Sequence, residues 1–383
     1  MEIYLDNAAT TKPSKALLPL FSAHVESEWK NPSAMYPPAV AAERQLRAAR
    51  ETLAGAVHAD PAGVVFTSGG TEGANTAILR GYRAAGEKKL HFITSAYEHP
   101  CVYECFRALE TAGHSVDYIR PRADGKIHPE DVAEKVREDT ALVSVMHVNN
   151  ETGAVNDVVG IAAAVKAKNP GTAVHADGVQ GYGKCPLDFG GSALDYYTAS
   201  AHKLHGLKGT GVLFYKKNAP LKPYLLGGGQ ERGLRSGTEN TFGILAFARA
   251  VEEYMAHREE WVAHMAALKA YLLGKLSDIP DMRIFSPADG APHILNLAFP
   301  GMRGEVLLHL LEQKEIYIST GSACSSHKKR AGSRVHQALG VPADITQGVV
   351  RLSFCPENTE EEMETAAAAI KEALAGFRGF IRR

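Results

Sequence analysis

The feature that most constrains the fold is an alternation of short apolar runs with helical stretches between about residues 60 and 250. Strands separated by helices are typical of βαβ units, which build a mostly parallel sheet flanked by helices. Strands are expected at residues 64–67, 90–93, 115–119, 142–146, 174–176, 196–198 and 211–215. Ligands of such sheets bind where the strands end and the loops begin, so a functional site is expected there.

The remainder of the chain has a different pattern. Residues 240–275 read as one long helical region, and residues 305–313 and 359–375 as shorter helices. Further strands are expected at residues 282–285, 294–298 and 315–318. The pattern predicts an α/β protein with two parts. The larger, residues 15–255, holds the mostly parallel sheet, and the smaller α+β domain comprises residues 1–14 and 256–383.

The composition of the chain limits the classes of partner that it can bind. The chain has 42 Lys and Arg against 43 Asp and Glu, a formal net charge of −1. Direct nucleic-acid binding is disfavoured, because neutralising phosphates needs a basic surplus. No apolar run is long enough for a membrane span, and the N-terminus does not resemble a secretory signal. The 5 cysteines, an odd number, favour a reducing cytoplasm.

Two strand ends carry side chains suited to one kind of cofactor chemistry. Lys203 lies just after the strand at 196–198, where its amine could form a Schiff base with an aldehyde cofactor. Asp177 closes the strand at 174–176 and could keep a pyridine nitrogen protonated, as an electron sink requires. Either residue alone is more often a solvated charge.

A third strand end offers an anion site. Gly70 and Thr71 lie between a strand and a helix, where backbone N–H groups and the helix dipole favour a phosphate. The side chains of Ser200 and His202 could complete this phosphate site. Such a turn is more often only a turn. Together with the lysine and the aspartate, however, it indicates pyridoxal 5'-phosphate.

Ten short motifs follow one another along the chain. They are LDNAATT (5–11), NPS (31–33), TSGGTEGAN (67–75), EHP (98–100), HVNNETG (147–153), HADGVQ (175–180), SAHKLHGLKGTG (200–211), GGGQERGLRSGTEN (227–240), GSACSS (321–326) and RLSF (351–354). In this order they resemble the cysteine desulfurases, fold-type I pyridoxal-phosphate enzymes related to the class V aminotransferases. The resemblance implies removal of sulfur from L-cysteine, giving L-alanine and an enzyme-bound persulfide. A sulfur acceptor protein, for iron–sulfur cluster assembly or tRNA thiolation, would take the sulfur.

The resemblance also implies roles for individual residues. Lys203 would bind the cofactor aldehyde, Asp177 the pyridine nitrogen and Gln180 the ring hydroxyl. Asn150 would contact the ring oxygen and the substrate. The phosphate would be held by Gly70, Thr71, Ser200 and His202.

Four more residues receive roles in the same way. His99 would stack on the ring and take part in proton transfer, and Arg351 would bind the substrate carboxylate. Thr238 would reach the phosphate of a partner subunit, which implies a homodimer. Cys324 would be the catalytic cysteine of the small domain. Its polar loop continues with the basic run 327–330, and nearby positive charge favours the reactive thiolate.

Several alternatives stay open. A selenocysteine lyase or a class V aminotransferase would share the fold, although an aminotransferase would not need Cys324. A catalytically silent relative is disfavoured because the expected cofactor residues are present. Cys101 and Cys105 have a spacing that could bind metal, but no second ligand cluster accompanies them. No metal is therefore expected, and the cysteines other than Cys324 are expected to be structural.

Overall fold

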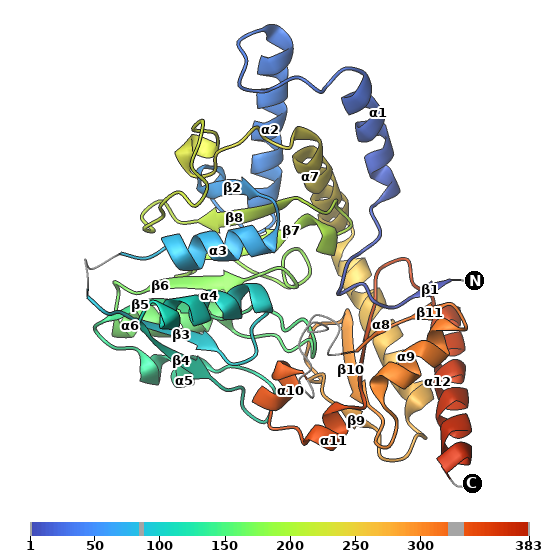
Figure 1. Ribbon diagram of the computed structural model, residues 1–383. Coiled ribbons are helices and arrows are strands. Elements are labelled where there is room, and N and C mark those ends of the chain that lie inside the picture. Colours follow the sequence, from blue (N-terminus) through green and yellow to red (C-terminus); the bar gives the residue numbers. More distant parts are fainter. Residues whose placement is uncertain (1, 84–87, 321–332, 382–383) are drawn as a thin grey trace.

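The structure is a computed structural model that describes residues 2–83, 88–320 and 333–381 (Figure 1). Its largest element is a seven-stranded sheet of order β2-β8-β7-β6-β5-β3-β4. The strands, in that order, are β2 (Val64–Thr67), β8 (Gly211–Tyr215), β7 (Tyr196–Ser200), β6 (Ala173–Asp177), β5 (Thr140–Ser144), β3 (His91–Ser95) and β4 (Ser115–Ile119). Only β8 is antiparallel to its neighbours, so the predicted mostly parallel sheet is confirmed.

Helices cover both faces of this sheet because successive strand residues point to opposite sides. In β2, Val65 packs in one apolar cluster with helices α3 (Gly70–Arg80) and α4 (Pro100–Thr111). The next residue, Phe66, packs in the larger cluster on the other face. That cluster includes residues of α2 (Pro37–Gly55), α5 (Pro129–Lys135), α6 (Val158–Lys168) and α7 (Thr241–Ala256). Burial on both faces explains why the strands are nearly continuous apolar runs.

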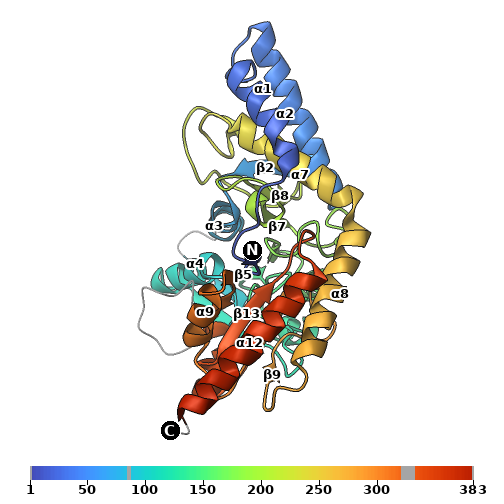
Figure 2. The same ribbon diagram turned by 90° about the vertical axis from the view of Figure 1, so that its right-hand side faces the viewer.

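A second, antiparallel sheet lies beside the first and has the order β12-β13-β10-β9. Its strands are β12 (Ser319–Thr320), β13 (Val349–Ser353), β10 (Ile294–Ala298) and β9 (Arg283–Ile284). The helices around it are α8 (Arg258–Leu276), α9 (Gly304–Glu312), α10 (Arg334–Ala338), α11 (Ala343–Thr346) and α12 (Glu360–Ile381). Helix α8 packs against α12 (Figure 2). This is the predicted smaller α+β unit.

The N-terminal segment joins the two sheets. Strand β1 (Ile3–Tyr4) pairs with β11 (Ile316–Tyr317). Residues 5–11 then pass from the small sheet to the large one: Ser353 donates its N–H to the Leu5 oxygen, and Thr11 donates its N–H to the His202 oxygen. Beyond them, α1 (Leu18–Glu26) and the start of α2 project as an arm (Figures 1 and 2).

Two sequence expectations need correction. The helical region 240–275 is two helices, α7 and α8, because His257 leaves helical geometry at φ −118° and ψ 10°. Helices α1, α5, α10 and α11 were not predicted. Within the described part of the chain, no helix has the length and apolar character that crossing a bilayer requires.

Candidate active site

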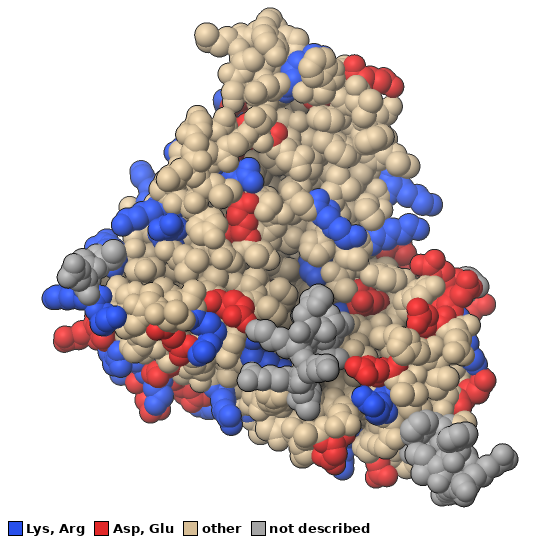
Figure 3. All heavy atoms as spheres, viewed as in Figure 1, with Lys and Arg blue, Asp and Glu red and all other residues tan. Residues whose placement is uncertain are grey.

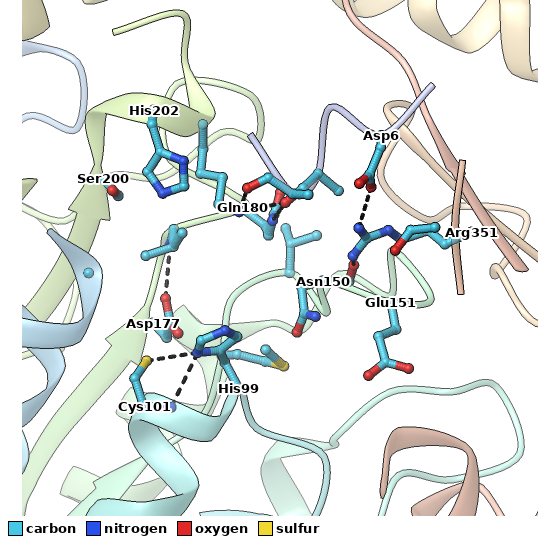
Figure 4. A pocket seen from close by; sticks show the side chains of 18 of the residues that line it. Asp6, His99, Cys101, Asn150, Glu151, Asp177, Gln180, Ser200, His202 and Arg351 are labelled. Atoms are coloured by element: carbon cyan, nitrogen blue, oxygen red, sulfur yellow. Dashed lines mark hydrogen bonds and ion pairs between the residues drawn. The ribbon is translucent and has the colours of Figure 1, made fainter. Parts of the chain in front are cut away.

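A cavity of about 490 Å³ opens between the two sheets, at the carboxyl ends of the parallel strands. Its wall combines residues from the strand ends, the N-terminal segment and the small sheet (Figure 4). The residues that line it are Asp6, Ala8, Ala9, Gly70, Thr71, His99, Cys101, Met146, Val148, Asn150, Glu151, Asp177, Val179, Gln180, Ser200, His202, Lys203, Ser319, Thr320 and Arg351.

The strand ends supply an acid and an amine. Asp177 is the last residue of β6, and its Oδ1 accepts the Val179 N–H at 3.0 Å. Lys203 ends a 3-10 turn directly after β7, and its ammonium donates to the carbonyl oxygens of Ala8 and Ala9. Burial raises the pKa of Asp177 to about 6, against the lowering effects of the Val179 N–H and the Lys203 charge. A cationic ring nitrogen beside this carboxylate would oppose that rise.

The first turn of α3 leaves backbone N–H groups free to bind an anion. Its N-cap, Gly69, has φ 153°, a conformation that side chains rarely adopt. Gly70 lies so close to Val179 that a Cβ atom there would approach Val179 Cγ2 to 2.4 Å. The two glycines therefore allow the helix start to reach the cavity. Ser200 and His202 line the wall beside it.

The opposite wall is built around a guanidinium. Arg351, in the middle of β13, pairs with Asp6 at 2.6 Å and donates to the Asn150 oxygen at 2.8 Å. Its Nε is buried and has no hydrogen-bond partner. Arg351 lines the cavity, so its guanidinium can meet a carboxylate that enters there.

Two imidazoles in the cavity are held neutral. Burial, followed by the charges of Lys203 and Arg334, lowers the pKa of His99 to about 4. Burial and the Lys203 charge lower the pKa of His202 to about 4. Both rings can therefore donate or accept hydrogen bonds near neutral pH without carrying a charge.

Most of the residues expected from the sequence come together here. The cavity unites Gly70, Thr71, His99, Asn150, Asp177, Gln180, Ser200, His202, Lys203 and Arg351. Thr238 is an exception, since it does not line the cavity of its own chain. Cys324 lies outside the described residues.

Sequence reasoning missed three ionisable residues of the wall, Asp6, Cys101 and Glu151. Asp6 belongs to a quoted motif, but nothing in the sequence indicated that it would meet Arg351. Glu151 follows Asn150 directly, and Cys101 was assigned to helix packing. Proximity to a motif residue was the only available signal for these two. No group of three or more His, Cys, Asp or Glu side chains among the described residues is placed to hold a metal.

The donor set fits pyridoxal 5'-phosphate. A buried carboxylate, an amine, neutral imidazoles and a helix N-terminus match the cofactor's pyridine nitrogen, aldehyde, ring and phosphate. Gln180 has a buried Oε1 without a partner, as a hydroxyl donor would require. A mostly parallel sheet with this site at its strand ends defines a fold-type I pyridoxal-phosphate enzyme.

Comparison with known proteins gives the family. The model of the family "Aminotransferase class-V" matches residues 3–365. A NifS/IcsS protein homolog of Lactobacillus delbrueckii subsp. bulgaricus is 40% identical over 98% of this chain and 98% of its own. A cysteine desulfurase of Nostoc sp. is 35% identical over 98% of this chain and 94% of its own.

Comparison with a solved structure supports the same family. A NifS-like protein superposes with a TM-score of 0.91 at 35% identity, covering 98% of this chain and all of that one. The chain belongs to the class V aminotransferase family and, within it, to the cysteine desulfurases. It is a pyridoxal-phosphate-dependent enzyme that removes sulfur from L-cysteine.

Proposed function

We propose that the cavity residues share the work of cysteine desulfuration as the sequence resemblance implies. The observation that carries this is that one cavity holds Lys203, Asp177 and Arg351 together. Lys203 would bind the cofactor aldehyde, Asp177 its ring nitrogen and Gln180 its hydroxyl. The phosphate would lie at the start of α3, held by Gly70, Thr71, Ser200 and His202. When bound, the cofactor supplies an electron sink for the substrate α-carbon.

The substrate would be held by its carboxylate. Arg351 lines the cavity, and a guanidinium can bind a carboxylate in a two-point geometry. Asn150, whose backbone oxygen accepts from Arg351, would contact both substrate and cofactor. This arrangement fixes the amino acid at one end and leaves its sulfur free to react.

Proton and sulfur transfer would then use three residues. The Lys203 amine removes the α-proton, and His99, neutral beside it, assists proton transfer. The Cys324 thiolate attacks the substrate sulfur, so an S–S bond forms as the carbon–sulfur bond breaks. The products are L-alanine and a persulfide on Cys324. A sulfur acceptor protein, for iron–sulfur assembly or tRNA thiolation, takes that sulfur.

The working unit would be a homodimer, with Thr238 contacting the partner subunit's cofactor phosphate. The projecting arm supports this, because it exposes apolar side chains that a second copy would cover. Leu18, Phe21, Val25 and Trp29 are 54–66% exposed, and Met35 is 94% exposed. On the face seen in Figure 3 the arm is largely free of charged residues, whereas basic and acidic residues intermingle below it.

Two broader features belong to the same proposal. Large and small domains, residues 15–255 against 1–14 and 256–383, would enclose the cavity, consistent with its position between two sheets. A cytoplasmic location fits the thiols: Cys101, Cys105, Cys185 and Cys355 are all free. A direct nucleic-acid partner is not needed for this chemistry.

The decisive experiment follows alanine formation and protein-bound sulfur in three variants. Cys324→Ser is expected to lose persulfide formation, and Lys203→Ala to lose the visible absorbance of the bound cofactor. Cys355→Ser, a matched thiol outside the cavity wall, should behave as wild type. Full sulfur transfer by Cys324→Ser would refute the nucleophile assignment, and unchanged absorbance of Lys203→Ala would refute the lysine assignment.

A further inference from the structure

Cys101 lies beside His99 in the cavity wall, at the start of α4. His99 is the N-cap of that helix, and Pro100, the next residue, has no N–H to offer. The first helical N–H available is therefore that of Cys101, and it donates to His99 Nδ1 at 3.2 Å. The Cys101 sulfur lies 3.0 Å from the same nitrogen (Figure 4). One ring nitrogen thus faces two groups of a single residue.

The direction of these hydrogen bonds fixes the protonation of the ring. A backbone N–H can only donate, so Nδ1 must present its lone pair. The thiol then has to donate as well, because Nδ1 carries no hydrogen. Burial raises the pKa of the Cys101 thiol well above its usual value, so the thiol keeps the hydrogen that it donates. The single hydrogen of the neutral imidazole is therefore on Nε2.

The surroundings disfavour the doubly protonated ring. The start of a helix carries partial positive charge, which repels an imidazolium. Lys203 and Arg334 act in the same direction on His99. The carboxyl groups of Asp177 and Glu98 lie near the thiol of Cys101 and oppose its ionisation. Lys203 and Arg334 therefore favour the neutral ring, and the Asp177 carboxyl group favours the protonated thiol.

We propose that Cys101 is a positioning residue for His99: its thiol and backbone N–H hold the imidazole as the neutral Nε2–H tautomer. This fixes Nε2 as the ring nitrogen that can give up a proton in the cavity. The proposal deepens the proposed function and rests on the proton-transfer role given to His99. It assigns Cys101, which the sequence placed among the packing residues, to the reaction itself.

The test is nitrogen NMR of histidine-labelled holoenzyme, with the His99 signals identified by their loss in His99→Gln. Wild type should show an unprotonated Nδ1 and a protonated Nε2, with titration near pH 4. Cys101→Ala keeps the backbone N–H and therefore the Nε2–H tautomer, but it loses the thiol donor. It should raise the pKa of His99 and lower kcat about 5-fold, the effect of one hydrogen bond. KM for cysteine should hardly change. Cys101→Ser, which keeps a side-chain donor, should restore both the pKa of His99 and kcat.

Cys105→Ala is the control, because this thiol lies one helical turn away, is buried and donates to the Cys101 oxygen rather than to His99. A protonated Nδ1 in wild type would overturn the proposal. So would a Cys101→Ser variant that behaves like Cys101→Ala, because that result indicates packing alone. Full activity of His99→Gln would instead refute the role of His99, while the tautomer measurement would still judge the Cys101–His99 contact.

Discussion

The two walls of the cavity are built in different ways. On the large-sheet side, Asp177 is the last residue of β6, Lys203 ends the turn after β7, and Gly70 starts the helix that follows β2. On the small-sheet side, the key contact joins Asp6 to Arg351, residues 345 positions apart. On the first wall, each of these residues lies where a strand ends and a turn or helix begins. The second depends on a segment that crosses from one sheet to the other.

The residues of the two walls are therefore held in place in different ways. Residues at strand ends are held by the sheet itself, so their positions follow from local structure. Arg351 is oriented instead by partners on two other segments, the Asp6 carboxylate and the Asn150 oxygen. We therefore expect substitutions on the first wall to affect the chemical step, and substitutions on the second to affect substrate binding or the stability of the junction.

The largest effect is expected from Asp177→Asn. The variant keeps the shape of the side chain but loses the charge that would keep the cofactor nitrogen protonated. We expect kcat to fall by roughly 10²–10³-fold, as for other preorganised groups that stabilise developing charge. Steady-state kinetics on cofactor-saturated enzyme measures this. Asp139→Asn, an exposed carboxylate paired with Arg137, is the control. A loss confined to KM would contradict the assignment.

Glu151→Gln tests the junction through stability. Burial raises the pKa of Glu151 from 4.5 to about 7, while Ser333 donates to its carboxylate. Folded protein therefore keeps a proton that unfolded protein releases between pH 4.5 and 7, and wild type loses stability as the pH rises through that window. The loss is at most about 3 kcal/mol.

The Glu151→Gln variant lacks this titration, so its stability advantage over wild type should grow across the same pH range and then level off. Urea unfolding at a series of pH values measures the difference. Glu98 is also buried, but it is present in both proteins, so its contribution to the pH dependence cancels in the difference between them. Glu305→Gln, at an exposed position, is the control for the substitution itself. A constant difference between the Glu151→Gln variant and wild type would show that Glu151 does not hold the proton.

A smaller effect is expected from Arg351→Lys. The charge remains, but the fork that reaches a carboxylate, Asp6 and the Asn150 oxygen together is lost. KM for cysteine should rise roughly 10–100-fold, corresponding to one charged hydrogen bond, with a smaller change in kcat. Arg303→Lys, on the exposed N-cap of α9, is the control. An unchanged KM would place the carboxylate elsewhere.

The first wall was largely predictable from sequence and the second was not. Asp177, Lys203 and the glycine turn stood out because apolar strands ended at them. Arg351 was assigned through the family resemblance, but its pairing with Asp6 depends on how the N-terminal segment crosses the sheets. Cys101 was assigned to packing because no second ligand cluster accompanies it and Cys105. Its contact with His99 depends on the N-cap geometry, which spacing does not reveal.

The break between α7 and α8 illustrates the same limit in the fold. Residues 240–275 contain no proline, and the only glycines in them, Gly243 and Gly274, lie near the two ends. Helical pattern alone therefore predicts one helix. The turn at His257 is accompanied by tertiary contacts, since its ring stacks on Trp261, which packs edge-on against Tyr254. Such contacts override local propensity.

The most direct test of the central claim is to locate the sulfur. Wild-type holoenzyme is mixed with one equivalent of L-cysteine, trapped with an alkylating reagent and digested for mass spectrometry. The account predicts one additional sulfur atom on the peptide containing Cys324, matched by one equivalent of L-alanine. An additional sulfur on Cys101, the cysteine in the cavity wall, or alanine formed without any protein-bound sulfur, would contradict it.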